Sequence, residues 1–207
     1  YKYDKFLREK GIQCKVFNPF RPVLNIIQNN RDHRKICVID GKTGFTGGIN
    51  LADEYINQKE RFGHWKDTAV MLKGDAVWSM TMMFLHMWNV VNGIQTPIDY
   101  AAHSPHAYHP EEFEGSGFVQ PFTDTPLDGE TLGENVYLNI INRAKRYVYI
   151  CTPYLIIDNE MMTALCLAAK SGVDVRIMTP GVPDKKNGIP SYPVLLCAAD
   201  RSRCKNL

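Results

Sequence analysis

The residues with the clearest chemical potential lie at positions 29–50, in the stretch NNRDHRKICVIDGKTGFTGGIN. One residue separates His33 from Lys35, and Asp40 follows after four more. Alternate side chains of an extended chain point the same way, so we expect the His33 imidazole beside the Lys35 ammonium. Lysine binds phosphate oxygens, and histidine attacks phosphorus or carries a proton near neutral pH. The pair predicts phosphate chemistry, and two solvated polar side chains at a strand end are the plainer alternative.

Two glycines and an amide follow this pair, at Gly47, Gly48 and Asn50. A glycine lets the backbone turn sharply or approach a ligand closely, because it carries no Cβ. The asparagine side chain adds an amide donor. We therefore expect Gly48 and Asn50 to contribute to the same phosphate site.

Regular secondary structure is expected to hold these residues in place. A short buried strand is predicted at 34–41, and Asp40-Gly41 predicts a turn into a second extended run at 43–46. A helix beginning at 51–57 would direct its N-terminus, which attracts anions, toward the site. Around them we expect a helix ended by Gly11, strands at 14–17 and 68–72, and a helix at 75–92 that is core rather than the lining of an acyl-chain groove.

The second half of the chain predicts another run of alternating helices and strands, which indicates the α/β class. A stretch rich in proline and glycine at 93–134 marks a boundary. Beyond it we expect a helix at 134–146, a buried strand at 147–156, a helix at 161–170 and a strand at 173–178. This order suggests a duplication at the level of the fold. We divide the chain into residues 1–118 and 119–207.

The composition, with 22% charged residues and a formal net charge of +2, is that of an ordinary globular protein and gives no reason to expect a nucleic-acid partner. Six scattered cysteines without a CxxC predict reduced thiols, with Cys37 and Cys151 in the core. His103, His106 and His109 are spaced three apart, but intervening prolines argue against a metal site.

The longest apolar run, residues 76–91, is too short to cross a bilayer, which takes about 20 apolar residues. We therefore expect this chain to be soluble, with any membrane anchor outside it.

The full spacing H-x-K-x(4)-D-x(6)-G-G-x-N resembles the HKD motif of the phospholipase D superfamily at every position. From about residue 3 to residue 185 the chain looks like the bacterial cardiolipin synthase branch. The supporting segments are N-P-F-R at 18–21, N-x-R-x-H-R-K at 29–35, G-G-I-N-x-A-D-E-Y at 47–55, F-G-x-W-K-D-T at 62–68 and T-P-Y-L-I-x-D at 152–158. The resemblance implies a two-lobed α/β fold, with a mixed sheet flanked by helices in each lobe and the active site at the seam.

The resemblance also implies roles for individual residues. His33 would be the nucleophile that forms a phosphohistidine or the general acid, and both remain open. Lys35 and Asn50 would hold phosphate oxygens without a metal or other cofactor. Asp67, in the W-x-D element, would orient the His33 ring as a carboxylate fixes an imidazole. Asp40 would brace its turn.

The chain departs from the family in having no second H-x-K-x(4)-D, and the sequence after Lys186 no longer resembles the branch. The second lobe is therefore expected to be incomplete and the chain to carry half a site. The first hypothesis is a phosphatidyltransferase that converts two phosphatidylglycerol molecules to cardiolipin and glycerol at the cytoplasmic side of a bacterial cell membrane. Water as acceptor, giving a phospholipase D or phosphodiesterase, and a catalytically silent phosphate-binding lobe are the alternatives. A homodimer would supply two copies of His33.

Overall fold

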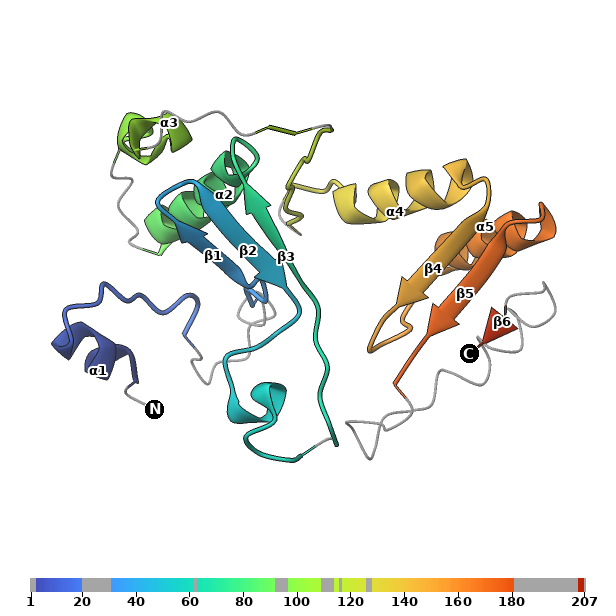
Figure 1. Cartoon of the computed structure of the whole chain (residues 1–207), viewed down its shortest axis with the longest axis horizontal. Helices are drawn as coiled ribbons and strands as arrows, with labels where there is room; N and C mark the ends of the chain where they lie inside the picture. The colour runs from blue at the N-terminus through green and yellow to red at the C-terminus, as the bar shows by residue number, and fades with distance from the viewer. Residues whose placement is uncertain are drawn as a thin grey trace. The chain divides into compact units, whose positions relative to one another are not determined.

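The computed structural model describes residues 3–19, 31–61, 63–91, 97–108, 114–115, 117–125, 128–180 and 205–206. The chain forms two compact units. Unit 1 comprises residues 1–59 and 65–122, and unit 2 comprises residues 60–64 and 123–207. Each unit contains a small sheet with helices beside it (Figure 1), which confirms the α/β class.

The sheet of unit 1 is an antiparallel meander of β1 (Ile36–Ile39), β2 (Thr43–Gly47) and β3 (Ala69–Lys73). The predicted turn joins β1 to β2. Asp40 and Gly41 have φ angles of 54° and 66°, and the Lys42 N–H donates to the Ile39 carbonyl at 3.0 Å. Two successive positive φ angles are typical of a hairpin turn that matches the twist of its strands.

Helix α2 (Val77–Val90) packs against this sheet (Figure 1). Gly44 of β2 allows the close approach, because a Cβ there would lie 2.8 Å from the Met80 Sδ. Val77 and Met80 are fully buried, as a core helix requires. No helix in the described part of the chain is long and apolar enough to span a membrane.

The remaining elements of unit 1 are short: α1 (Tyr3–Glu9), the 3-10 helices η2 (Asp53–Ile56) and η3 (Ala101–His103), and α3 (Pro105–Tyr108). Gly11, with φ 81°, ends α1 as predicted. The strand predicted at 14–17 is wrong, because that segment is irregular. The strand predicted at 34–41 is shorter than expected, and its side chains are half-buried or exposed rather than buried.

Unit 2 has a parallel sheet of β4 (Tyr147–Cys151), β5 (Asp174–Met178) and β6 (Lys205–Asn206). Helices α4 (Leu132–Arg143) and α5 (Asn159–Lys170) pack together beside it. Asp158 caps α5 by accepting a hydrogen bond from the Met161 N–H at 2.8 Å. The core side chains are Ile141, Leu155, Ala164, Leu165, Ala168, Ala169, Val173, Val175 and Ile177. Neither sheet mixes strand directions among its described strands.

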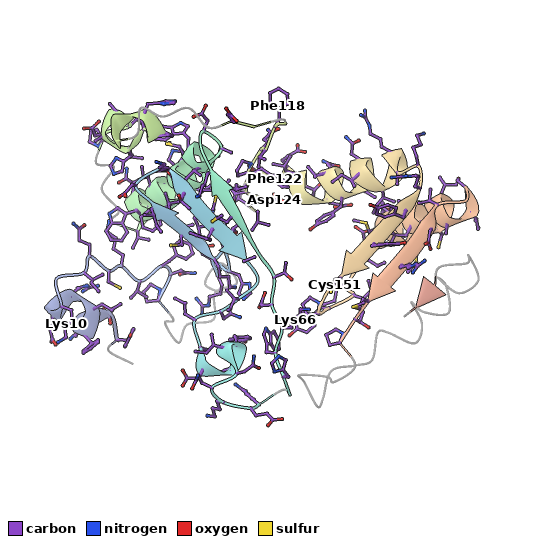
Figure 2. All side chains as sticks on the ribbon, in the orientation of Figure 1. Lys10, Lys66, Phe118, Phe122, Asp124 and Cys151 are labelled. Atoms are coloured by element: carbon purple, nitrogen blue, oxygen red, sulfur yellow. The ribbon has the colours of Figure 1, made fainter. Side chains whose placement is uncertain are left out.

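Burial alternates along β4, which corrects two predictions. Tyr147 and Tyr149 are each 56% exposed, so β4 is not a buried strand on both faces. Cys151, labelled at the end of β4 in Figure 2, is exposed, and so is Cys37 on β1. Both cysteines lie on sheet faces opposite the packed helices, because side chains alternate between the two faces of a strand.

Candidate active site

His33 and Lys35 lie in an extended segment immediately before β1, not within a regular strand. Side chains still alternate along this segment. Arg34 donates from Nε to Asp32 Oδ1 at 2.8 Å and from Nη2 to Oδ2 at 3.0 Å. The hydrogen bonds from Arg34 hold the pKa of Asp32 below its ordinary value. The Asp32–Arg34 pair therefore fixes one side of the segment and leaves the other side to His33 and Lys35.

The structure brings the His33 and Lys35 side chains together. The Lys35 Nζ lies 2.9 Å from Nδ1 and 3.0 Å from Nε2 of the His33 ring, and it donates to the His33 carbonyl at 2.6 Å. An ammonium donates only to a ring nitrogen that carries a lone pair. The Lys35 ammonium can therefore donate to one of the two His33 nitrogens at a time, the one that carries the lone pair.

The charge on Lys35 is set by three neighbouring influences. Burial lowers the pKa of Lys35, while the negative charges of Asp67 and Asp32 oppose that shift. Asp67 is distant in sequence but acts on the ammonium that would hold a phosphate oxygen. The carboxylates thus help keep Lys35 charged in a partly desolvated position.

Asp67 itself is held by its own segment. Its Oδ2 accepts a hydrogen bond from the Trp65 indole Nε1 at 3.0 Å, and its Oδ1 accepts from the Thr68 N–H at 2.8 Å. No hydrogen bond joins Asp67 to His33 within the described residues. The orientation of the His33 ring by Asp67 therefore stays a prediction, while the negative charge of Asp67 acts to raise the pKa of Lys35.

Gly47 and Gly48 allow the end of β2 to press against β3 and Asp67. A Cβ on Gly47 would lie 2.5 Å from the Thr68 carbonyl oxygen, and one on Gly48 would lie 2.6 Å from Asp67 Oδ1. The Gly48 N–H donates to the Thr68 carbonyl at 3.3 Å. The structure shows this close approach toward protein atoms, and a phosphate contact by Gly48 stays a prediction.

Among the described residues, no hydrogen bond joins Asn50 or Asp40 to the His33–Lys35 pair. Asn50 is half-buried. Its role at phosphate stays a prediction. Asp40 is exposed in the turn, with the whole of β1 between it and Lys35. That position agrees with an interpretation of Asp40 as a turn residue.

The histidines considered for metal binding have separate partners. His103 Nδ1 contacts the Asp99 carbonyl at 2.8 Å, and His106 Nε2 contacts Asp75 Oδ1 at 3.3 Å. His109 lies outside the described residues. Among the residues that are described, no group of three or more metal-ligating side chains is present.

Two features of the site were missed from the sequence. The Asp32–Arg34 pair has a readable signal, since opposite charges two residues apart face the same side of an extended chain. Asn57 has no such sequence signal, although its side chain forms hydrogen bonds with both the N–H and the carbonyl of Trp65. Nothing in the spacing of Asn57 relates it to the W-x-D element.

Known proteins resemble this chain over most of its length. It is 55% identical over 186 residues to an uncharacterised protein of Streptococcus mutans, covering 90% of this chain and 39% of that protein. It is 40% identical to cardiolipin synthases of a Geobacillus species and of Clostridium perfringens, covering 89% and 87% of this chain and 36% and 38% of theirs. The chain thus spans less than two fifths of the length of these relatives.

A family model described as "Cardiolipin synthase, PLD-like domain" matches residues 137–198. That match lies in unit 2, whereas the H-x-K-x(4)-D residues lie in unit 1. The relatives cover both units, because the similarity extends over nearly nine tenths of the chain. Over nearly nine tenths of its length, the chain is similar to proteins of the cardiolipin synthase branch of the phospholipase D superfamily.

Proposed function

We propose that this chain supplies one half of the active site of a phosphatidyltransferase that makes cardiolipin from two phosphatidylglycerol molecules. The contact between Lys35 Nζ and both ring nitrogens of His33 is the observation that carries the proposal. A lysine ammonium is suited to binding phosphate, and an imidazole is suited to acting as nucleophile or proton carrier, so the contact supports this assignment. Unit 1 would belong to the first lobe of the family fold and unit 2 to an incomplete second lobe, close to the division at 118 and 119.

The reaction needs two histidines. A ring nitrogen of one attacks the phosphorus of phosphatidylglycerol, and the bond from phosphorus to the head-group glycerol oxygen breaks. The second histidine gives that oxygen a proton, and glycerol leaves. The glycerol hydroxyl of another phosphatidylglycerol then attacks the phosphohistidine, loses its proton to the second histidine, and breaks the phosphorus–nitrogen bond. His33 takes one of these roles, and Lys35 holds a phosphate oxygen throughout.

The second histidine must come from elsewhere, because the chain has one H-x-K-x(4)-D. Another polypeptide segment or a second copy of the chain would provide it. The proposal places the reaction at the cytoplasmic side of a bacterial membrane, with attachment through parts outside this chain.

The test uses the purified chain with phosphatidylglycerol vesicles, with and without added imidazole as a substitute for the second histidine. Cardiolipin, glycerol and phosphatidic acid are quantified, and mass measurement gives the oligomeric state. We expect turnover that requires either imidazole or the dimer, and that His33→Ala abolishes. Exposed His64 gives the matched control His64→Ala, which should retain turnover.

Three results would decide between the candidates. Cardiolipin with glycerol supports the transferase, whereas phosphatidic acid as the only lipid product assigns water as acceptor and overturns transfer. Equal product from His33→Ala and the unaltered chain removes His33 from the mechanism. No product under any condition, together with saturable head-group binding, supports the silent lobe instead.

A further inference from the structure

The side chain of Asn57 forms two hydrogen bonds with the segment that carries the W-x-D element. Its side-chain Nδ2 donates to the Trp65 carbonyl at 2.8 Å, and its Oδ1 accepts from the Trp65 N–H at 2.6 Å. One amide therefore satisfies both backbone groups of a residue that lies in no helix or strand. This is the pairing that a neighbouring strand would otherwise provide.

The backbone conformation of Asn57 directs its side chain toward this contact. Asn57 ends η2 in the left-handed region, with φ 59° and ψ 23°, and its N–H donates to the Asp53 carbonyl. Asparagine tolerates this conformation better than most residues with a Cβ. The side chain is thus presented at a fixed angle by a closed turn of backbone.

The Trp65 ring is fixed from the same element. Tyr55, within η2, meets the indole edge to face, with ring centroids 4.9 Å apart and planes at 88°. The indole Nε1–H then donates to Asp67 Oδ2 at 3.0 Å. Asn57 thus holds the backbone of Trp65, and Tyr55 of η2 holds its ring. The indole ring in turn holds the Asp67 carboxylate through its hydrogen bond.

Asp67 connects this arrangement to the phosphate-binding lysine. Its negative charge raises the pKa of Lys35 against the lowering caused by burial, and Asp32 acts in the same direction. The His33 ring also contacts the Lys35 ammonium. Displacing Asp67 would therefore weaken the charged form of the group that holds a phosphate oxygen.

We propose that Asn57 is a positioning residue for the active site, acting through Trp65 and Asp67 on Lys35. The proposal rests on the proposed function, since it gives Lys35 the role of binding the substrate phosphate. The competing interpretation is that Asn57 only stabilises the loop that contains Trp65. That interpretation predicts a change in stability without any change at Lys35.

The test compares Asn57→Gly with the unaltered chain, because glycine keeps the positive φ and removes only the amide. NMR follows hydrogen exchange of the Trp65 indole N–H, identified by its loss in Trp65→Phe, and the titration of Lys35. Binding of glycerophosphoglycerol, the soluble head-group diester, is measured separately. We expect faster indole exchange, Lys35 titration at lower pH, and roughly threefold to tenfold weaker binding, the scale of a single net hydrogen bond.

A double variant distinguishes positioning from loop stabilisation. Asn57→Gly added to Trp65→Phe should shift the Lys35 titration no further, because Trp65→Phe has already removed the hydrogen bond from the indole to Asp67. Exposed Asn142 on α4 provides the control Asn142→Ala, which should change none of the readouts. If Asn57→Gly does not fold, Asn57→Asp is measured in the same way, since it keeps the acceptor and loses the donor.

Unchanged Lys35 titration in a folded Asn57→Gly would overturn the proposal, as would a full additional shift in the double variant. Altered indole exchange and Lys35 titration in a chain that binds no glycerophosphoglycerol would overturn the proposed function while leaving the positioning role in place.

Discussion

The two units hold their sheets by different means. Unit 2 contains nine of the buried core side chains around its parallel sheet, whereas the described buried apolar residues of unit 1 are Val77 and Met80 on α2 and Pro105 on α3. In unit 1 the chemically important segments are instead held by hydrogen bonds among neighbours, as with Asp32–Arg34 and Asn57–Trp65.

This difference has a consequence for mutation. Removing an apolar side chain from unit 2 leaves a cavity, and the free energy of unfolding falls. Removing a polar side chain near His33 changes charge and geometry on exposed or half-buried residues, where little packing is lost. Function and stability should therefore separate between the two units.

The largest effect is expected from His33→Ala. A positioned proton carrier contributes roughly 10²- to 10⁴-fold to a rate, and a covalent nucleophile is indispensable to its step, so turnover of phosphatidylglycerol in the imidazole-supplemented assay should fall by at least that factor. His33 is exposed, so the thermal unfolding midpoint should not move. A large drop in that midpoint would show that His33 stabilises the fold of unit 1. Function and stability would then not separate between the two units.

The next largest effect is expected in the core of unit 2. Leu165 is 2% exposed on α5, and Leu165→Ala should lower the free energy of unfolding by about 2–5 kcal/mol. Leu167, two residues along the same helix and 58% exposed, gives the matched variant Leu167→Ala, which should cost far less. Denaturant unfolding measures both. Equal costs would mean that unit 2 is not stabilised by this core.

A smaller effect is expected at the start of α4. Asp124, labelled in Figure 2, accepts a hydrogen bond from the Gly133 N–H at 2.7 Å, which satisfies one free donor at this helix end. Asp124→Ala should cost about 1 kcal/mol of unfolding free energy, the usual value for a lost cap. Asp124→Asn keeps an acceptor oxygen and should retain most of this stabilisation. A similar loss in both variants would contradict the hydrogen-bond explanation.

The smallest effect is a shift in pH dependence. Under the proposed function Lys35 binds phosphate as an ammonium, so binding should be present below the pKa of Lys35 in the folded protein and lost as pH rises through that pKa. Asp67 raises that pKa, and Asp67→Asn should therefore move the alkaline loss of glycerophosphoglycerol binding to lower pH. Asp40→Asn is the control, because it lies in the turn beyond β1 and keeps a residue tolerant of positive φ. A shift of equal size in both variants would refute the specific action of Asp67.

The sequence predicts what depends on local signals. The Asp40-Gly41 turn, the end of α1 at Gly11 and the helices at 75–92 and 161–170 follow from turn residues and apolar spacing, and the structure contains them. The convergence of His33 and Lys35 also follows, because it requires only an extended backbone.

Other predictions failed where the answer depended on tertiary context. The segment 14–17 has the composition of a strand, but in the structure it is not part of a sheet. Cys37 and Cys151 lie in apolar runs, yet each is on the sheet face away from the helices. The amide of Asn57 reaches a tryptophan eight residues away, and no periodicity encodes that contact.

The most direct test of the phosphate site is an NMR titration of the chain with glycerophosphoglycerol, following the His33 ring and the Lys35 ammonium together. If His33 and Lys35 share a phosphate site, both signals should shift and saturate at the same concentration. Lys35→Met should then abolish the His33 response, and Lys66→Met, at the exposed lysine labelled in Figure 2, should leave it intact. Signals that do not move, or a His33 response that survives Lys35→Met, would contradict a shared phosphate site.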